Sequence, residues 1–331
     1  MLRIVFMGSD AIALPALDWI ADSGIAQVVG VFTQPDRAAG RGQKVQANAI
    51  KLWAEAKGLP VFQPVKPGET ERAQLAALQP DLTLVMAYGH ILRQEMIDVP
   101  RLGTVNLHTS ILPKYRGASP IQTATASGEV ETGVTLMKLV LQLDAGPVAE
   151  VEKVAIGRLD TAASVEAKLA RATVPLLQRC LPAIARGTQE FTPQDAAAAT
   201  FCRRLEKSDG VLDFSQPARV LAARVNGLNP WPGCSVAING QIVKLGLADV
   251  GEVGQASVAA EPGTVLGQDA EGLRVAAGQG LLRLRKLQRP GGKLLEASEF
   301  LRGWPVAAGT VLPSQAMPPL VGAVPFPYRR G

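Results

Sequence analysis

The stretch LRIVFMGSDAIALPALDWIADSGIAQVVGVFT (residues 2–33) decides the fold class, because it places a helical pattern between two apolar runs. The runs at 2–8 and 28–33 are continuous and of strand length, and between them Leu14 and Leu17 share one face of a helix. Continuous apolar runs indicate strands that are buried on both faces. A strand, a helix and a second such strand form the repeating unit of a parallel sheet.

The same alternation continues through the first half of the chain. Further apolar runs of strand length lie at 81–87 and 104–108, and helical patterns lie at 50–56 and 71–78. Strands separated by helices predict an α/β fold, with a Rossmann-like open, mainly parallel sheet and helices on both faces. Ligands of such sheets bind beyond the carboxyl ends of the strands. We therefore expect the functional residues at that edge.

The second half has a different organisation. A strand pair at 133–140 and 146–156 is followed by a long helix at 161–186, and then by a polar, Ala-rich stretch typical of a linker. Beyond it, a helix at 217–227 precedes several short strands separated by Gly, Asn and Asp turns, a pattern that predicts a small, OB-like C-terminal β-barrel. We expect a catalytic domain at 1–187, a linker at 188–207 and a barrel domain with a Pro-rich tail at 208–331.

The composition argues against several classes of protein. Hydrophobic residues make up 47% of the 331 residues and charged residues 19%, as in an ordinary globular protein. No apolar run reaches the roughly 18 residues that a membrane span needs, and the start lacks a signal-peptide pattern. Cys180, Cys202 and Cys234 lie far apart, which disfavours a disulfide framework or a zinc site. We expect a cytoplasmic protein with no metal and no membrane contact, and a monomer.

The excess of positive charge is concentrated near the C-terminus. Of 34 basic and 29 acidic side chains, residues 204–331 hold 14 and 10, so that residues 1–203 hold the remaining 20 and 19. The net charge is therefore +4 in the shorter part and +1 in the longer part. A basic module is compatible with a phosphate-backbone partner. Many proteins that bind no nucleic acid show the same balance.

Asn106 and His108 are the first candidates for chemistry. They lie two residues apart near the end of an apolar strand, so both side chains project from one face at the carboxyl edge. An amide donor beside an imidazole suits acyl transfer, because one stabilises an oxyanion and the other moves protons near neutral pH. A polar strand end capped by a loop explains the pair equally well.

The loop after His108 and a later aspartate extend the set. Residues 109–122 contain prolines and a glycine that predict an irregular loop, with Lys114 and Arg116 supplying positive charge at a solvated surface or toward a polyanion. Asp144 lies in a Leu-Asp-Ala-Gly turn, where spacing alone favours a turn residue. It gains a chemical role only if the fold returns it to His108.

These segments resemble a known family. GTVNLHTSILPKYRGASPIQ followed by GVTLMKLVLQLDAG is similar to the signature of the folate-dependent formyltransferases, built on Asn, His and a later LD-x-G aspartate. FTQPDRAAGRG, VMAYGHIL, NPWPG and LQRPGGKLLEASEFLRG resemble the methionyl-tRNA formyltransferases in particular. The resemblance runs from Arg3 to about Val311.

The resemblance implies an activity and a catalytic set. The formyl group of 10-formyltetrahydrofolate would pass to the amino group of methionine on charged initiator tRNA, through a tetrahedral intermediate. Asn106 and His108 would hold the oxygen of the intermediate and shuttle protons. Asp144 would orient His108 and help to protonate the folate nitrogen that leaves.

The resemblance also implies binding residues for both substrates. Folate contacts would come from two loops, comprising Ser110, Ile111, Leu112 and Pro113 in one and Met86, Tyr88, Gly89 and Ile91 in the other. The basic segment at 36–44 would contact tRNA through Arg37, Arg41 and Lys44. Composition alone indicates only a flexible surface loop there.

Some positions depart from the family, and other functions stay open. The usual Gly-Thr-Pro-x-Phe-Ala is Gly8-Ser9-Asp10-Ala11-Ile12-Ala13 here, and the usual Gln after AYG is His90. A formyltransferase acting on an amino sugar or another small amine would share the catalytic set, although it would require neither the basic loop nor the barrel. A non-catalytic RNA-binding protein is a further alternative.

Overall fold

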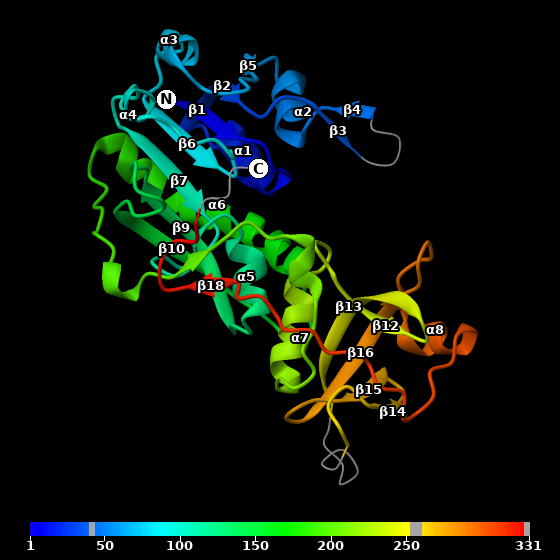
Figure 1. The fold of residues 1–331 in the computed structure, drawn as a ribbon. Helices are drawn as coiled ribbons and strands as arrows, with labels where there is room; N and C mark the ends of the chain where they lie inside the picture. The colour runs from blue at the N-terminus through cyan, green and yellow to red at the C-terminus, as the bar shows by residue number, and fades with distance from the viewer. Residues whose placement is uncertain (40–43, 252–259, 328–331) are drawn as a thin grey trace. The chain divides into compact units, whose positions relative to one another are not determined.

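The computed structural model describes residues 1–39, 44–251 and 260–327, and its ribbon is drawn in Figure 1. The chain forms two compact units. The first contains residues 1–116, 133–154 and 166–199. The second contains residues 117–132, 155–165 and 200–331.

A mainly parallel sheet of seven strands forms the centre of the first unit. Its order is β10-β9-β7-β6-β1-β2-β5. The pairs among β1, β2, β5, β6 and β7 are parallel, whereas β9 runs antiparallel to β7. The strands are β1 (Leu2–Gly8), β2 (Ala26–Phe32), β5 (Val61–Phe62), β6 (Leu82–Met86), β7 (Thr104–His108), β9 (Glu131–Lys138) and β10 (Val148–Ala155). The predicted fold class is confirmed.

Both faces of the central strands are buried, which explains their continuous apolar runs. On β1, Val5 and Met7 belong to a core that also holds Leu75 from α3 and Met96 from α4. Alternate residues of a strand point to opposite faces, and Ile4, on the other face, is also fully buried. The helices of this region are α1 (Leu14–Asp22), α2 (Ala49–Ala56), α3 (Glu69–Ala77), α4 (Gln94–Ile97) and α6 (Ala162–Arg186), with a short 3-10 turn η1 (Ala11–Ala13).

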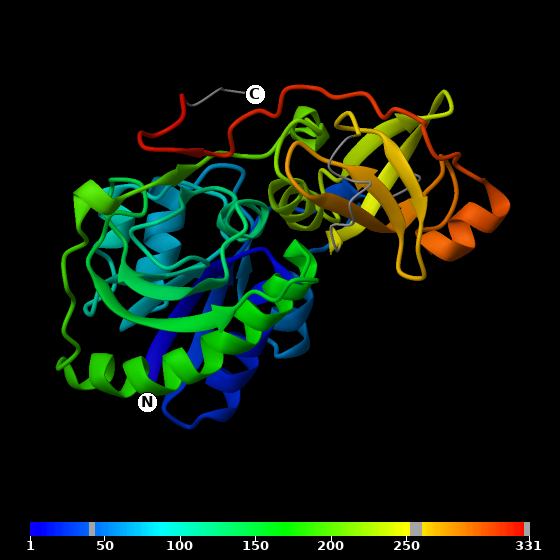
Figure 2. The ribbon, with the colours of Figure 1, turned by 90° about the horizontal axis from the view of Figure 1, so that it is seen from below.

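The basic segment has more structure than its composition predicts. Instead of a loop throughout, β3 (Arg37–Ala39) and β4 (Lys44–Gln46) pair antiparallel as a short hairpin. The tip, residues 40–43, lies outside the described residues. Figure 2 gives a second view of the same ribbon, turned by 90°.

The second unit contains a separate antiparallel sheet. Its order is β12-β13-β16-β15-β14, with β17 paired to β16. Phe214, Leu221 and Leu284 are fully buried in the core of this unit. Its strands are β12 (Cys234–Ile238), β13 (Gln241–Gly251), β14 (Val265–Gln268), β15 (Leu273–Ala276), β16 (Leu281–Gln288) and β17 (Leu295–Glu296). Its helices are α5 (Pro120–Ala126), α7 (Ala218–Gly227) and α8 (Ala297–Gly303), with a 3-10 turn η3 (Lys207–Gly210). Another 3-10 turn, η2 (Ala196–Ala198), belongs to the first unit.

The Pro-rich tail is ordered by strand pairing. β18 (Val321–Gly322) pairs antiparallel with β11 (Phe201–Cys202), and a small sheet has the order β18-β11-β8, where β8 is Arg116–Gly117. Leu312 and Leu320 of the tail are buried. Residues 313–327, the described part of the tail, therefore form an extended strap.

Candidate active site

Asn106 and His108 lie at the carboxyl end of β7, which lies between β6 and β9 in the sheet. Asn106 is opposite Met137 and His108 is opposite Thr135 on β9. Because the two residues are separated by one position, their side chains leave the same face of the strand. His108 is 6% exposed, whereas Asn106 is partly exposed. The structure thus presents an amide and an imidazole together at the end of a buried strand.

The ring of His108 is fixed by a backbone group. Nε2 lies 2.9 Å from the carbonyl oxygen of Tyr115. A carbonyl only accepts hydrogen bonds, so Nε2 carries the proton of the neutral ring and Nδ1 keeps its lone pair. Nδ1 faces Asp144, whose Oδ2 is 3.8 Å away. That separation is too long for a direct hydrogen bond, and it leaves Nδ1 as the nitrogen that can exchange a proton.

The loop after β9 brings Asp144 to the histidine. Asp144 has φ +45°, in the left-handed region that side chains other than Gly rarely adopt. Its carboxylate is 14% exposed. The turn contains a backbone hydrogen bond from Ala145 N–H to Gln142 O, 3.3 Å long. Spacing alone favoured a turn residue, and Asp144 is both a turn residue and a neighbour of His108.

Two further residues lie beside the Asn106, His108 and Asp144 set, and the sequence pattern predicted neither of them there. Arg116 is only 3% exposed, so it is not the solvated cation that the sequence indicated. Its guanidinium donates from Nε and Nη2 to Oε1 of Gln194, at 3.1 and 2.8 Å. Gln194 belongs to the segment predicted as a linker. A single polar residue in an aperiodic stretch carries no local signal of such a contact.

The loop from Ser110 to Pro113 is held by its own polar groups. The Ser110 hydroxyl donates to the Lys114 carbonyl at 2.7 Å. The Thr135 hydroxyl donates to the Ser110 carbonyl at 2.6 Å and accepts from Leu112 N–H at 3.2 Å. Ser110 and Leu112 are buried, while Ile111 and Pro113 are partly exposed. Ile111 and Pro113 are therefore the residues of this loop with side chains open to a ligand.

The loop after β6 presents mostly backbone. Met86 is fully buried, and the Tyr88 ring lies in the apolar core of the first unit, where burial raises the pKa of its phenol. Gly89 has φ +77°, which glycine adopts without strain. Ile91 is 80% exposed. His90 packs edge-on against Tyr88, with ring centroids 4.9 Å apart, and burial lowers its pKa.

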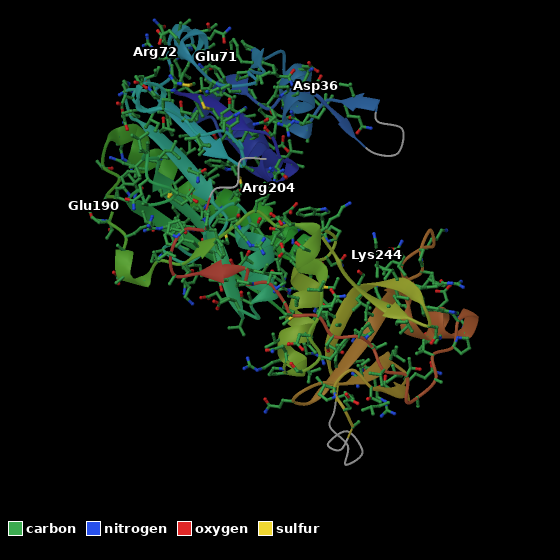
Figure 3. All side chains as sticks on the ribbon, in the orientation of Figure 1. Asp36, Glu71, Arg72, Glu190, Arg204 and Lys244 are labelled. Carbon is green, nitrogen blue, oxygen red and sulfur yellow. The ribbon has the colours of Figure 1, made fainter. Side chains whose placement is uncertain are left out.

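The β3–β4 hairpin is anchored at its base. Asp36 accepts from Nζ of Lys51 on α2 at 2.6 Å and from Nε2 of Gln63 at 2.8 Å. These bonds, first that from Gln63 and then that from Lys51, lower the pKa of the Asp36 carboxyl. Figure 3 labels Asp36 at this position. Arg37 is exposed and donates from Nη2 to Oε1 of Gln34 at 2.7 Å.

The two other predicted tRNA contacts are placed only in part. Lys44 is the first residue of β4, where its backbone pairs with Ala39. Arg41 lies outside the described residues.

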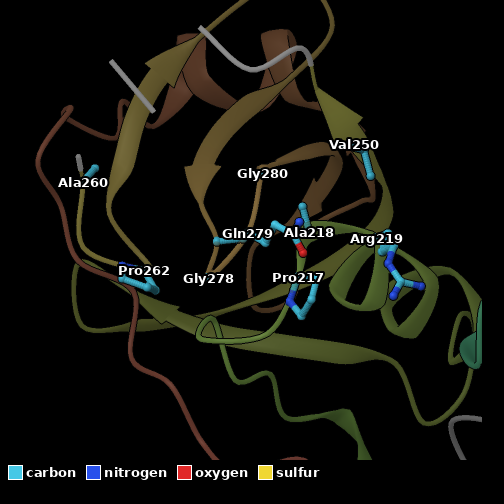
Figure 4. Close-up of a pocket in the computed structure, with 10 residues that line it drawn as sticks. Pro217, Ala218, Arg219, Val250, Ala260, Pro262, Gly278, Gln279 and Gly280 are labelled. Carbon is cyan, nitrogen blue, oxygen red and sulfur yellow. The ribbon is translucent and has the colours of Figure 1, made fainter. Parts of the chain in front are cut away.

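A separate depression lies in the second unit and has little to offer acyl transfer. It is bordered by the start of α7 and by the turn after β15, as Figure 4 shows. Among its ten lining residues Arg219 alone is charged. In residues 1–39, 44–251 and 260–327, no three His, Cys, Asp or Glu side chains gather to hold a metal ion. Over those same ranges, no helix has both the length and the apolar character that crossing a membrane requires.

Comparison with known families covers both units. The family described as "Formyl transferase" matches residues 2–181, and "Formyl transferase, C-terminal domain" matches residues 204–305. The chain is 43% identical over 300 residues to the methionyl-tRNA formyltransferase of Ectopseudomonas mendocina, covering 90% of this chain and 94% of the relative. It is 42% identical over 318 residues to that of Burkholderia multivorans, covering 93% and 96%.

Solved structures share the fold at lower identity. The N-formyltransferase from Helicobacter canadensis, in complex with folinic acid and dTDP-3-aminofucose, matches with a TM-score of 0.65 and 16% identity, covering 86% of this chain and 99% of that chain. HypX from Aquifex aeolicus, in complex with tetrahydrofolic acid, matches with a TM-score of 0.58 and 18% identity, covering 91% of this chain and 47% of HypX. At these identities the likeness shows the fold alone.

Proposed function

The chain belongs to the methionyl-tRNA formyltransferases, and from that premise we propose how its residues transfer a formyl group to the methionine of charged initiator tRNA. The donor is 10-formyltetrahydrofolate. The observation that carries the proposal is the pairing of His108 Nδ1 with Asp144 Oδ2, 3.8 Å apart, at the edge of the sheet where Asn106 also projects. Relatives above 40% identity over both units support the activity.

Asn106 and His108 act on the first step. The methionine amino nitrogen forms a bond to the formyl carbon, and the electron pair of the carbonyl moves onto the formyl oxygen. The Asn106 amide donates a hydrogen bond to this oxygen, which stabilises the developing charge. His108 Nδ1, free of the Tyr115 contact that engages Nε2, takes the proton that the amino nitrogen loses.

Asp144 acts on the proton and on the second step. Its carboxylate stabilises the imidazolium that forms when Nδ1 is protonated. The bond from the formyl carbon to the folate nitrogen then breaks, and the nitrogen takes the proton held between His108 and Asp144. The charges and protons balance without a further reactant.

The two loops beside the site supply the folate subsite. Of the predicted contacts, Ile91 has an exposed side chain, and Ile111 and Pro113 have partly exposed ones. Met86 and Tyr88 have buried side chains, so they contribute through their backbone, as Gly89 does. Structures of the same fold in complex with tetrahydrofolic acid and folinic acid support a folate as cosubstrate.

The basic hairpin and the basic second unit supply the tRNA contacts. Arg37 projects from the hairpin in an exposed position, and Arg41 and Lys44 follow on the same segment. Residues 204–331 carry a net charge of +4, from 14 basic and 10 acidic side chains. Binding through phosphates releases counterions, so tRNA affinity falls steeply as salt rises. We propose a cytoplasmic monomer that meets its acceptor through these surfaces.

A panel of acceptors tests the function. The full chain is supplied with 10-formyltetrahydrofolate and, separately, with charged initiator tRNA, charged elongator tRNA and nucleotide-linked amino sugars. We expect formylation of initiator methionyl-tRNA and little product from the others. The sugar N-formyltransferase structures share only the fold. Preferred formylation of an amino sugar would overturn the proposal.

A further inference from the structure

The side chain of Gln194 makes four hydrogen bonds to nitrogen and oxygen atoms beside the Asp144 loop, besides a long contact of 4.0 Å from Nε2 to Sδ of Met137. Its Nε2 donates to the backbone carbonyls of Asp144 and Gly146, at 2.8 and 2.7 Å. Its Oε1 accepts from Nε and Nη2 of Arg116, at 3.1 and 2.8 Å. An amide has two N–H donors and a carbonyl oxygen with two lone pairs. Gln194 therefore commits its full hydrogen-bonding capacity to this arrangement, called here the Gln194 clasp.

The loop that the clasp holds has an unfavourable backbone. Asp144 lies at φ +45°, a conformation that persists only where the surroundings enforce it. The 3.3 Å bond from Ala145 N–H to Gln142 O is long for a turn. Gly146 packs so closely on Lys138 that a Cβ there would clash with the Lys138 carbonyl oxygen. The bonds from Gln194 hold the carbonyl of Asp144 within the turn and that of Gly146 just after it.

Arg116 adds a charge to the same arrangement. Its side chain is almost fully buried, and a buried guanidinium needs hydrogen-bond acceptors to offset its lost hydration. Burial lowers the pKa of Arg116, and the negative charge of Asp144 acts in the opposite direction. The guanidinium therefore lies within electrostatic reach of the Asp144 carboxylate while Gln194 holds it in place.

We propose that Gln194 is a positioning residue for formyl transfer, which sets the Asp144 carboxylate opposite Nδ1 of His108. It acts on Asp144 through the loop carbonyls and through the placement of Arg116. It lies 50 residues along the chain from Asp144, in the segment that follows α6. This inference rests on the proposed role of Asp144.

The first test compares single variants of the full chain. Gln194→Leu removes all four bonds, and Gln194→Glu keeps the acceptor for Arg116 while losing both donors. Misplacing a catalytic group by about 1 Å costs up to ~100-fold, so we expect both variants to lower kcat by ~10- to 100-fold. KM for tRNA should stay within about twofold of the wild-type value, because the contacts that bind tRNA in the ground state are unchanged. The matched control is Gln189→Leu, since within the part of the chain that the structure describes the Gln189 side chain bonds only to the carbonyl of the next residue.

A second test separates positioning from general support of the fold. The Gln194→Leu change is repeated in an Asp144→Asn background, and single-turnover rates are compared. If Gln194 acts through Asp144, its loss costs much less there, because residues that work as a unit are not additive. Equal losses in both backgrounds would overturn the inference and leave the role of Asp144 intact. Full activity of Asp144→Asn would instead overturn the proposed mechanism, and the inference with it.

Thermal unfolding of each variant shows whether a loss of activity results from a loss of the fold. Gln194→Glu is close to isosteric with the native residue, so it reports even if Gln194→Leu does not fold. Wild-type kcat in a folded Gln194→Glu variant would show that the two donated bonds are dispensable, and would contradict the inference.

Discussion

Two half-buried glutamines of the first unit make the same kind of contact, but one holds a buried arginine and the other an exposed one. Gln194 links a buried arginine, Arg116, to the carbonyls of Asp144 and Gly146. Gln34 links an exposed arginine, Arg37, to the carbonyl of Tyr88, with bonds of 2.7 and 3.0 Å. Hydrogen bonds in a low-dielectric interior are stronger and costlier to leave unmade. The Gln194 clasp, which holds a buried arginine, therefore fixes a geometry, whereas the contact of Gln34, called here the exposed clasp, leaves its arginine open to a partner.

The difference matches the demands of the two regions. Proton transfer at His108 needs atoms held to within fractions of an ångström, so a loop held firmly by side-chain hydrogen bonds is useful there. Contact with a polyanion depends on charge more than on exact placement, and an exposed side chain can adapt to it. Changes at the buried region should lower kcat, and changes at the exposed region should alter tRNA binding.

Removing the catalytic groups should have the largest effect. His108→Ala or Asp144→Ala should reduce formyl transfer by at least ~100-fold, the usual contribution of positioned acid–base groups. Binding of initiator tRNA, measured by filter retention, should be largely kept. Near-full activity in either variant would show that these residues do not carry the catalysis. The distinction between a catalytic region and a tRNA-binding region would then be lost.

Crowding the Asp144 loop should have the next largest effect. In Gly146→Ala the new Cβ clashes with the Lys138 carbonyl, so the backbone next to Asp144 must move. We expect a destabilisation of about 1–3 kcal/mol and a fall in kcat of ~10-fold or more. Gly68→Ala is the control, because its Cβ would meet only the Glu71 carboxylate, at 3.6 Å. Unfolding curves and kcat for both variants decide the outcome.

The sequence predicted the scaffold of this site well. The runs at 2–8 and 104–108 match β1 and β7, and the helix predicted at 161–186 matches α6 at Ala162–Arg186. These elements can be recognised in the sequence because burial imposes a period of two or of 3.6 on their apolar residues. The pairing of Asn106 with His108 follows from the same local rule.

What surrounds Asp144 could not be predicted from local pattern. The bonds of Gln194 join residues 78 and 50 positions apart, and nothing in a polar stretch marks such partners. The burial of Arg116 depends on the same tertiary contacts, so its charge was expected at the surface. The β3–β4 hairpin was expected as a loop because its strands, each of three residues, are too short to establish a periodicity.

Removing the charge of Arg37 from the exposed clasp should affect the binding of tRNA alone. Arg37→Ala should raise KM for charged initiator tRNA by ~3- to 10-fold and leave kcat unchanged. If Arg37 contacts one phosphate, the slope of log affinity against log salt should fall by about 1. Arg72→Ala is the matched control, because Arg72 is exposed but is paired with Glu69 on α3. An equal effect of the two variants would assign the loss to net charge rather than to the hairpin.

Removing the exposed glutamine should have the smallest effect, and it tests the comparison most directly. Gln34→Leu breaks the bonds to Arg37 and to the Tyr88 carbonyl, but Gln34 N–H still donates to Ser9 Oγ, and its carbonyl still accepts from Asn48. The backbone is thus held without the side chain, whereas the side chain of Gln194 bonds directly to the carbonyl of Asp144 itself. We expect KM for the folate donor and for tRNA each to rise by ~2- to 3-fold, with kcat kept. A loss of kcat as large as that in Gln194→Leu would show that both clasps position catalytic groups, and that burial does not distinguish them.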